Sequence, residues 1–459
     1  MNPIKVLLFL SIFGINHRIQ GQSDATTVLK FDSDNLSSNI IVNRYDFENI
    51  NKIPRYFKKS QILLLNKLEK NKDYQAQYGI LSKYVTNFGI ENFYSETRLL
   101  WRLAKLTEMF GDYEDAKSLY RLVLRHHHGG INTGEIELYY DSLNNQEVAQ
   151  FVPIEYYYEM VEHRKLIDTL MPPKGVLLNM GFSVNSRGAD YGPALSQNNG
   201  ALLFTSQREE LSMEINKNKN EDLYISFVDA YGTWSKAYAM QEINSNYNEG
   251  SACLSADGNT LYFSRCDCPS CYGDCDLFSA ILKDSIWTEI KNLGINVNSL
   301  SWDSHPSLSH SGDTLFFASD RLGGFGLSDI YFTTKKDGSW TQSQNMGPII
   351  NTRNNEVSPF FHPLFRVLYF SSNGQLYNFG GFDIYKSYNI MDKWSEPINI
   401  GPLVNGTGSE FYFTIDANSK DLYYARSSSK DLDKLDLYSF PLPMGARPDA
   451  VAQLRGSLT

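Results

Sequence analysis

Five acidic residues recur along the second half of the chain, each three residues before the proline, or its equivalent, of an apolar segment. They are Asp190, Glu249, Asp303, Glu356 and Glu410. A ring of carboxylates near a central channel could bind a cation or a sugar. An acid repeated in every unit more often accepts hydrogen bonds from backbone N–H groups of the neighbouring unit, and we favour that structural role. A glycosidase needs an acid and a base that differ in pKa and position, whereas these acids obey the repeat symmetry.

A second set of acids recurs every 53 or 54 residues, in segments of the form Asp-apolar-aromatic. These are Asp222, Asp276, Asp329, Asp383 and Asp436. In four of the five units an arginine follows the preceding apolar segment, at offsets that share one face of a strand. We predict charge-assisted pairs within these units: Arg208 with Asp222, Arg265 with Asp276, Arg321 with Asp329, and Arg426 with Asp436. The fourth unit has no such arginine, so backbone or Asn donors should satisfy Asp383.

All five cysteines fall within the second unit, at Cys253, Cys266, Cys268, Cys271 and Cys275. The spacing in CDCPSCYGDC suits a zinc knot. Thiols of an exported protein tend to oxidise, so disulfides are the favoured interpretation. We predict bridges Cys266–Cys275 and Cys268–Cys271, with Cys253 free.

Three consecutive histidines, His126, His127 and His128, suggest a metal site. Adjacent helical residues diverge by about 100°, and Gly129-Gly130 after them is typical of a helix C-cap. The favoured interpretation is that these imidazoles lie at the negative end of a helix dipole. There is no G-x-S-x-G, and the glycine-rich 323–329 connects two predicted antiparallel strands. We therefore predict no catalytic residue, metal ligand or cofactor-binding residue.

The elements that must position these residues are strands in five consecutive repeats. Each repeat has an apolar-turn-apolar segment typical of a hairpin, then the Asp-apolar-aromatic strand, then in four repeats a Trp leading to a final strand. Four strands per unit of about 53 residues predict a five-bladed β-propeller over 174–443.

The fifth repeat lacks its last strand, because no Trp follows Asp436. An early orphan copy supplies it: NMGFSVNS at 179–186 matches NMGPIINT at 345–352. We predict that this N-terminal strand, within 174–186, pairs with 434–440 and closes the ring without an open edge.

Residues 50–172 are predicted to be helical. Apolar residues over 99–123 keep a 3.6-residue period that Gly111-Asp112 interrupts, which indicates a helix hairpin. With small Ala104 and Ala116 at the contact, the pattern resembles a tetratricopeptide repeat. A degenerate echo lies 39 residues upstream, where Asp73-Tyr74 corresponds to Asp112-Tyr113.

Composition and the N-terminus narrow the class of protein. The 459 residues are 42% hydrophobic, enough for more than one core, and the net charge of -10 without a Lys/Arg block argues against a nucleic-acid partner. Residues 1–21 have the proportions of a secretory signal, followed by an extended segment, 22–49. No later apolar run predicts a transmembrane span, and no Cys near the cleavage point predicts a lipid anchor.

The repeat PxLSxDGxTLYFxS, with its later DIY, resembles the WD-like propeller repeat of the TolB type. The order of signal, tetratricopeptide-like helices and five-bladed propeller resembles the PorE-like, OmpA-family envelope proteins of Bacteroidetes, which are associated with type IX secretion. In that family a carboxypeptidase-regulatory-like β-sandwich and a peptidoglycan-binding domain follow. Here 444–459 looks like a linker and the first strand of such a sandwich.

The resemblance implies an α-then-all-β, multidomain fold and a non-enzymatic, exported protein-interaction scaffold. Its expected place is the periplasmic side of an outer membrane, and its expected partners are other envelope proteins. Peptidoglycan would be reached only through a C-terminal domain that this chain does not include. The alternatives are a glycan-binding propeller and a channel-site glycoside hydrolase.

Overall fold

The chain divides into two compact units. The computed structural model describes residues 26–29, 40, 42–126, 178–196, 200–208, 220–376, 378–416, 419–428, 431–448 and 452–455. The smaller unit, Met1–Ile40 with Arg447–Thr459, contains β1 (Thr26–Leu29) and β24 (Ala452–Arg455), which pair antiparallel. The predicted signal segment lies outside the described residues. Strand β24 falls in the stretch expected to start a β-sandwich.

Helices form the first part of the larger unit, Ile41–Ala446. They are α1 (Lys59–Lys70), α2 (Tyr74–Val85), α3 (Ile90–Ser95), α4 (Thr97–Met109) and α5 (Tyr113–His126). Asp73 accepts a hydrogen bond from Ala76 N, and Asp112 accepts one from Asp115 N, so both echo positions cap a helix. Helix α3 stands between the two hairpins and accounts for their 39-residue spacing.

The α4–α5 hairpin buries Leu100, Leu103 and Ala104 against Ala116 and Tyr120. These residues repeat at helical spacing, so each helix presents one apolar stripe to the other. Whether the hairpins belong to the tetratricopeptide class stays a prediction. The rest of the predicted helical region, 127–172, including His127 and His128, lies outside the described residues. None of the described helices is long and apolar enough to span a bilayer.

The propeller consists of five antiparallel sheets, and in the first four the main path of strands is paired in sequence order. The strands of blades 1 and 2 are β3 (Asp190–Leu195), β4 (Ala201–Ser206), β5 (Asp222–Phe227) and β6 (Tyr238–Ala239), then β7 (Asn248–Leu254), β8 (Thr260–Cys266), β9 (Cys275–Lys283) and β10 (Ile286–Asn292).

Blades 3 and 4 each carry a short additional strand against their third strand. Their strands are β11 (Asp303–Leu308), β12 (Thr314–Ser319), β13 (Asp329–Lys336), β14 (Ser339–Trp340) and β15 (Gln344–Asn345), then β16 (Glu356–Phe361), β17 (Val367–Ser372), β18 (Asp383–Ile390), β19 (Lys393–Trp394) and β20 (Ile398–Asn399).

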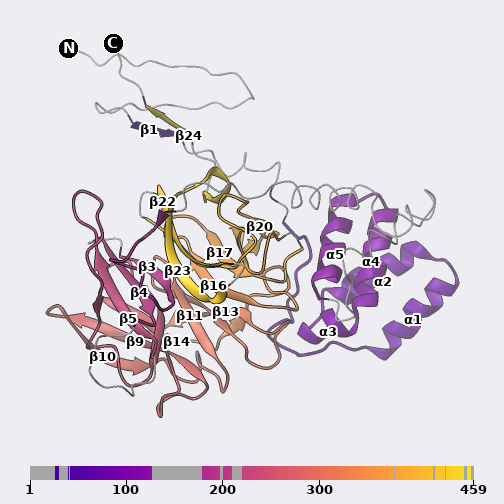
Figure 1. The fold of residues 1–459 in the computed structure, drawn as a ribbon. Helices are drawn as coiled ribbons and strands as arrows, with labels where there is room; N and C mark the ends of the chain where they lie inside the picture. The colour runs from indigo at the N-terminus through magenta and orange to yellow at the C-terminus, as the bar shows by residue number, and fades with distance from the viewer. Residues whose placement is uncertain are drawn as a thin grey trace, which may run out of the picture. The chain divides into compact units, whose positions relative to one another are not determined.

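Blade 5 contains the strand that closes the ring. It consists of β21 (Glu410–Ile415), β22 (Asp421–Ser428), β23 (Asp431–Pro441) and β2 (Leu178–Asn179). Leu178 lies opposite Ser439 and Asn179 opposite Tyr438, the pairing predicted from the early NMG copy. The first strands β3, β7, β11, β16 and β21 each contact the next, and β21 contacts β3. Figure 1 shows yellow β22 and β23 beside magenta β3 and β4.

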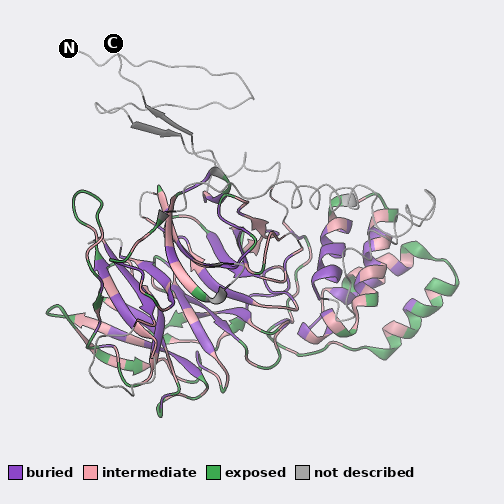
Figure 2. Ribbon diagram, in the orientation of Figure 1, coloured by how far each residue is buried: buried purple, intermediate pink, exposed green. Residues whose placement is uncertain are grey.

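Apolar side chains fill the space between neighbouring sheets. Figure 2 colours much of the propeller strands purple, as buried. Phe204, Phe263, Phe317, Phe370 and Tyr424 occupy equivalent positions on the second strands and are all fully buried. The four phenylalanine rings belong to separate apolar clusters at the blade junctions, and each cluster holds two neighbouring blades together.

The end of α5 packs against the junction of blades 3 and 4. Phe325, from the loop between β12 and β13, enters the helical core, with its ring 5.4 Å from Phe93 and 4.9 Å from His126. His126 Nε2 bonds Pro348 O at 2.9 Å, and Arg125 pairs with Glu396. His126 is therefore in the last helical turn, as expected, but is buried as a packing residue. No group of described residues has the composition of a metal site.

Candidate functional site

The five blade-opening acids are all fully buried. Four of them are the first residue of the innermost strand, and Glu249 is the second residue of its strand. Each carboxylate accepts a hydrogen bond from the backbone N–H four residues earlier, in the connection from the preceding blade. Those donors are Ser186, Ser245, Ser299, Thr352 and Gly406. A buried carboxylate needs such donors, since losing water is costly. The acids therefore tie each connection to the next blade, the structural role favoured from the sequence.

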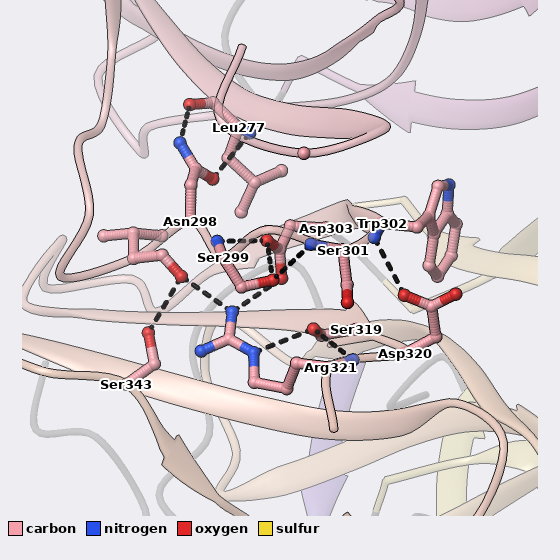
Figure 3. A network of polar contacts seen from close by, with 12 residues as sticks. Leu277, Asn298, Ser299, Ser301, Trp302, Asp303, Ser319, Asp320, Arg321 and Ser343 are labelled. Carbon is pink, nitrogen blue, oxygen red and sulfur yellow. Dashed lines mark hydrogen bonds and ion pairs between the residues drawn. The ribbon is translucent and has the colours of Figure 1, made fainter. Parts of the chain in front are cut away.

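The arginines do not pair with the third-strand aspartates, which corrects the predicted pairing. Each guanidinium instead forms an ion pair with the opening acid of its own blade. The distances are 2.9 Å for Arg208–Asp190, 2.7 Å for Arg265–Glu249, 2.6 Å for Arg321–Asp303 and 2.9 Å for Arg426–Glu410. In blades 1 to 3 the guanidinium also donates to the carbonyl of Val184, Ile243 or Val297 in the incoming connection. Figure 3 shows this arrangement around Arg321.

Strand register explains why spacing alone could not assign these pairs. Ser206 lies opposite both Asp190 and Asp222, and Arg265 lies opposite both Glu249 and Asp276. An arginine at this strand end can therefore reach toward either acid. Two patterns occur: an opening Asp faces Ser with Arg two residues later, in blades 1 and 3, whereas an opening Glu faces Arg directly, in blades 2 and 5.

Asparagines and loop amides hold the third-strand aspartates. Asp329 accepts from Phe325 N at 2.6 Å, Gly326 N at 3.1 Å and Asn345 Nδ2 at 2.6 Å. Asp276 has the equivalent donors, and Asp383 accepts from Phe379 N and from Asn399 Nδ2, the donor types predicted for it. At the ring closure, Asn179 Nδ2 donates to Asp436 at 3.2 Å.

A second asparagine completes this clamp. Asn351 accepts from Ile330 N and donates to Ile330 O and to Asn345 Oδ1. Asn185, Asn298 and Asn405 make the same bonds in their blades. The sequence signal for these asparagines is the repeated N-x-G-x-x-x-N, which begins both of the matching segments 179–186 and 345–352. It fixes the connection against the third strand by satisfying backbone groups at the end of the ladder.

Blade 4 lacks the arginine because the chain after β17 passes too close to the connection from blade 3. Gly374 stands two residues after Ser372, where blades 1 and 3 have Arg, and a Cβ there would lie 1.9 Å from Thr352 Oγ1. Gln375 Nε2 donates instead to Ile350 O at 2.9 Å. Glu356 accepts from the hydroxyls of Thr352 and Ser372 at 2.8 and 2.6 Å. Burial raises the pKa of Glu356 to about 8, so this carboxyl is mainly protonated at neutral pH.

Every innermost strand has a β-bulge two residues after its acid. The residue there has a left-handed backbone: Gly192 with φ 63°, Ser251 with 49°, His305 with 56°, Ser358 with 51° and Tyr412 with 59°. Residues other than glycine rarely adopt this backbone conformation, and bulges often redirect side chains at functional sites. All five residues line one central cavity of about 110 Å³.

A chain of hydrogen bonds connects three of these bulge residues. His305 Nδ1 accepts from Ser358 N at 3.2 Å, so Nε2 carries the proton and donates to the Tyr412 hydroxyl at 2.9 Å. Burial lowers the pKa of His305 to about 3, which keeps the imidazole neutral. The ring of Tyr412 stacks on Tyr191 at 5.3 Å, and Trp302 meets His305 edge-on at 4.9 Å.

The cavity has a neutral lining. Its described lining residues are Ser, Thr, Cys, His, Pro, Gly and apolar or aromatic residues, without Asp, Glu, Lys or Arg. The Ser358 hydroxyl is buried without a hydrogen-bond partner among the described residues. Such a site can bind an uncharged group, because a buried charge would find no counter-charge there. It does not offer the two carboxylates of a glycosidase, and the candidate ring acids point into the blade connections instead.

The cysteines of blade 2 form the two predicted disulfides. Cys266 is bonded to Cys275 and Cys268 to Cys271, which leaves Cys253 as the thiol. With these four sulfurs bonded to one another, the CDCPSCYGDC run does not form the zinc knot considered above. Burial in the cavity wall raises the pKa of Cys253 to about 12, so this thiol is a poor nucleophile.

Comparisons with known proteins bear on the fold. No protein-family model and no curated protein matches the sequence. Among solved structures, TolB from Acinetobacter baumannii is 15% identical with a TM-score of 0.36, and the match covers 56% of each chain. A putative TolB from Agrobacterium tumefaciens is 12% identical at 0.37, covering 61% of this chain and 89% of that one. An arabinanase from Bacillus subtilis is 12% identical at 0.38, covering 57% and 98%. At these values the likeness transfers no activity, and the five-bladed propeller is defined here by its own strand pairing.

Proposed function

We propose that the chain is a non-enzymatic, exported interaction scaffold of the bacterial cell envelope. Its place would be the periplasmic side of the outer membrane, linked to type IX secretion or to envelope anchoring. The observation that carries the proposal is that the repeated acids have a structural role. All five opening acids are fully buried and bonded to the incoming blade connections, and the cavity between the blades has a neutral lining.

Two further features support export and a scaffold role. Disulfides persist mainly in oxidising compartments, and blade 2 carries two of them within ten residues. The helices and the propeller belong to one compact unit, joined through Phe325, His126 and the Arg125–Glu396 pair. A unit of this kind presents a helical surface and a propeller surface to partners at the same time.

The proposal is tested by affinity purification of the full chain from its native cell envelope. We expect envelope proteins of defined stoichiometry to co-purify and the purified protein to leave polysaccharides unhydrolysed. Recovery of soluble oligosaccharide alone would contradict the scaffold role. Hydrolysis that Glu356→Gln abolishes without any change in unfolding free energy would instead establish an enzyme.

The second candidate function is binding of a neutral glycan in the channel. It is favoured by the unpartnered Ser358 hydroxyl beside His305 and Tyr412 in an uncharged cavity. Titration with neutral oligosaccharides, followed by calorimetry, tests it. Binding by the parent protein that Ser358→Ala weakens would support glycan recognition, and no heat at millimolar sugar would reject it.

A further inference from the structure

Helix α1 has an exposed face that combines leucine and lysine. Leu65 is the fully buried leucine of this helix, whereas Leu63 is 60% exposed and Leu64 is also exposed. Lys59, Leu63 and Lys67 are four residues apart and therefore share one side of the helix. Figure 2 shows much of α1 in the colour of exposed residues. The first helix of a helical array normally has a polar outer face. The apolar and basic face of α1 is therefore a candidate binding surface.

A second apolar surface lies on blades 2 and 3. Leu300 is 83% exposed and Leu322 is 98% exposed. Asp303 pairs with Ser319, and Trp302 and Asp320 extend that pairing through Trp302 N to Asp320 Oδ1 at 2.8 Å and Asp320 N to Trp302 O at 3.2 Å. Leu300 lies two residues before Trp302 and Leu322 two residues after Asp320, so this contact holds the two segments that carry them side by side. Figure 3 shows the contact between Trp302 and Asp320.

The disulfide loop of blade 2 borders the same surface. A Cβ on Gly273 would lie 2.0 Å from Ser301 O, so this loop packs directly on the segment that carries Leu300. The neighbouring Tyr272 is exposed. We name Tyr272, Leu300 and Leu322 the blade 2–3 patch. Exposed acids accompany it in the same loops: Asp267, Asp274 and Asp320.

The patch continues an interface that the molecule already makes. Leu322 lies in the loop that inserts Phe325 into the helical core. Tyr272 stands four residues before Asp276, as Phe325 stands four residues before Asp329, so the two aromatics are equivalent in adjacent blades. At the junction of blades 3 and 4 the chain's own helices cover this position. At the junction of blades 2 and 3 the equivalent position is exposed.

We propose that the exposed face of α1 in one copy of the chain docks on the blade 2–3 patch of a second copy. Leucines would meet Tyr272, Leu300 and Leu322, and lysines would meet the three aspartates. The apolar contact is favourable because it removes exposed side chains from water, and the opposite charges orient it. The two faces differ, so the contact is head-to-tail and leaves one free face on each end of a dimer. This inference goes beyond the proposed function and does not depend on it.

The test uses sedimentation velocity on the full chain with two complementary variants. Leu63→Ser/Leu64→Ser alters the helical face, and Leu300→Ser/Leu322→Ser alters the patch. We expect the parent protein to form oligomers that grow with concentration. For each variant alone, we expect the dissociation constant of self-association to rise by at least about tenfold. A 1:1 mixture of the two variants should form a heterodimer and nothing larger, because one intact contact remains.

A control variant alters exposed apolar residues outside both surfaces. Tyr231→Ser/Met391→Ser removes two other highly exposed apolar side chains and should leave association unchanged. If a serine variant fails to fold, the charge variants Lys59→Glu/Lys67→Glu and Asp274→Lys/Asp320→Lys replace them. Each should be monomeric alone, and their mixture should form chains longer than a dimer. A parent protein that stays monomeric at high concentration, or a variant mixture that stays monomeric, overturns the proposal.

Discussion

In blade 2 the opening acid Glu249 meets a guanidinium, whereas in blade 4 the equivalent Glu356 meets only hydroxyl and N–H donors. Blade 2 also holds its loop with two disulfides, and blade 4 uses glycines there. Both blades nevertheless keep the same acid position, the same bulge and the same Asn–Asp clamp. What the junction requires is a set of hydrogen-bond donors for a buried carboxyl group.

The difference between the two blades is therefore one of charge. A buried carboxylate is stable if a cation pairs with it, as in blade 2, or if the group takes up a proton, as the raised pKa of Glu356 indicates for blade 4. Ion pairs and protonated carboxyls depend differently on mutation and on pH.

Replacing Arg265 by Ala should have the largest effect. It leaves Glu249 buried without its cation, which costs about 3–5 kcal/mol of unfolding free energy. Denaturant unfolding monitored by tryptophan fluorescence measures the loss. The double variant Arg265→Ala/Glu249→Gln should recover most of it, and Arg366→Ala, which breaks an exposed pair with Asp392, should cost less than about 1 kcal/mol. A small loss in Arg265→Ala would mean that the blade 2 acid also takes up a proton.

Removing the outer disulfide of blade 2, Cys266–Cys275, should have a smaller effect. Asp276 still holds the loop through Tyr272 N, Gly273 N and Asn292, as Asp329 does without disulfides in blade 3. Replacing Cys266 and Cys275 by serine should cost about 2–3 kcal/mol, the chain-entropy value for one loop of this length. Unfolding should remain a single transition in calorimetry. Loss of cooperativity, or stoichiometric zinc in the reduced parent protein, would show that these cysteines have another role.

Glu356→Gln should change the pH dependence of stability. The folded pKa of about 8 lies above the unfolded value of 4.5, so the folded state binds more protons between these values. The stability that Glu356 contributes is complete below about pH 4.5 and is lost as the pH rises to about 8. The variant should therefore gain stability relative to the parent protein by about 1.4 kcal/mol per pH unit between pH 6 and 7.5. A constant difference over this range would show that Glu356 stays ionised.

Gln375→Ala should have the smallest effect. It removes one neutral hydrogen bond to Ile350 O, at the place where an arginine bonds the equivalent carbonyl in blade 3. We expect a loss of about 1 kcal/mol in urea unfolding, well below that of Arg265→Ala. Gln375→Glu is the matched control, since it keeps the size of the side chain but presents an acceptor to a carbonyl. Equal losses in Gln375→Ala and Arg265→Ala would remove the distinction between the two blades.

The sequence was sufficient for the architecture because that depends on periodic features. The spacing of the third-strand aspartates and the early copy of NMGFSVNS predict the blades and their closure, and both depend on backbone pairing alone. The arginine partners could not be predicted, because Ser206 and Arg265 each face an acid on both sides. The bulge residues Gly192, Ser251, His305, Ser358 and Tyr412 share a backbone conformation but not a single residue type, so no repeated letter in the sequence marks them.

The closing strand β2 has a consequence for how the protein is made. Leu178 leaves the ribosome about 260 residues before Ser439, the residue that it pairs with. Until β2 and β23 have paired, blade 5 has an unpaired edge at β23, and such edges associate readily with other chains. Contacts of this sequence separation also form slowly. We therefore expect folding of the propeller to be completed only after β23 has been synthesised, with a rate that falls when β2 is weakened even if the other four blades are unchanged.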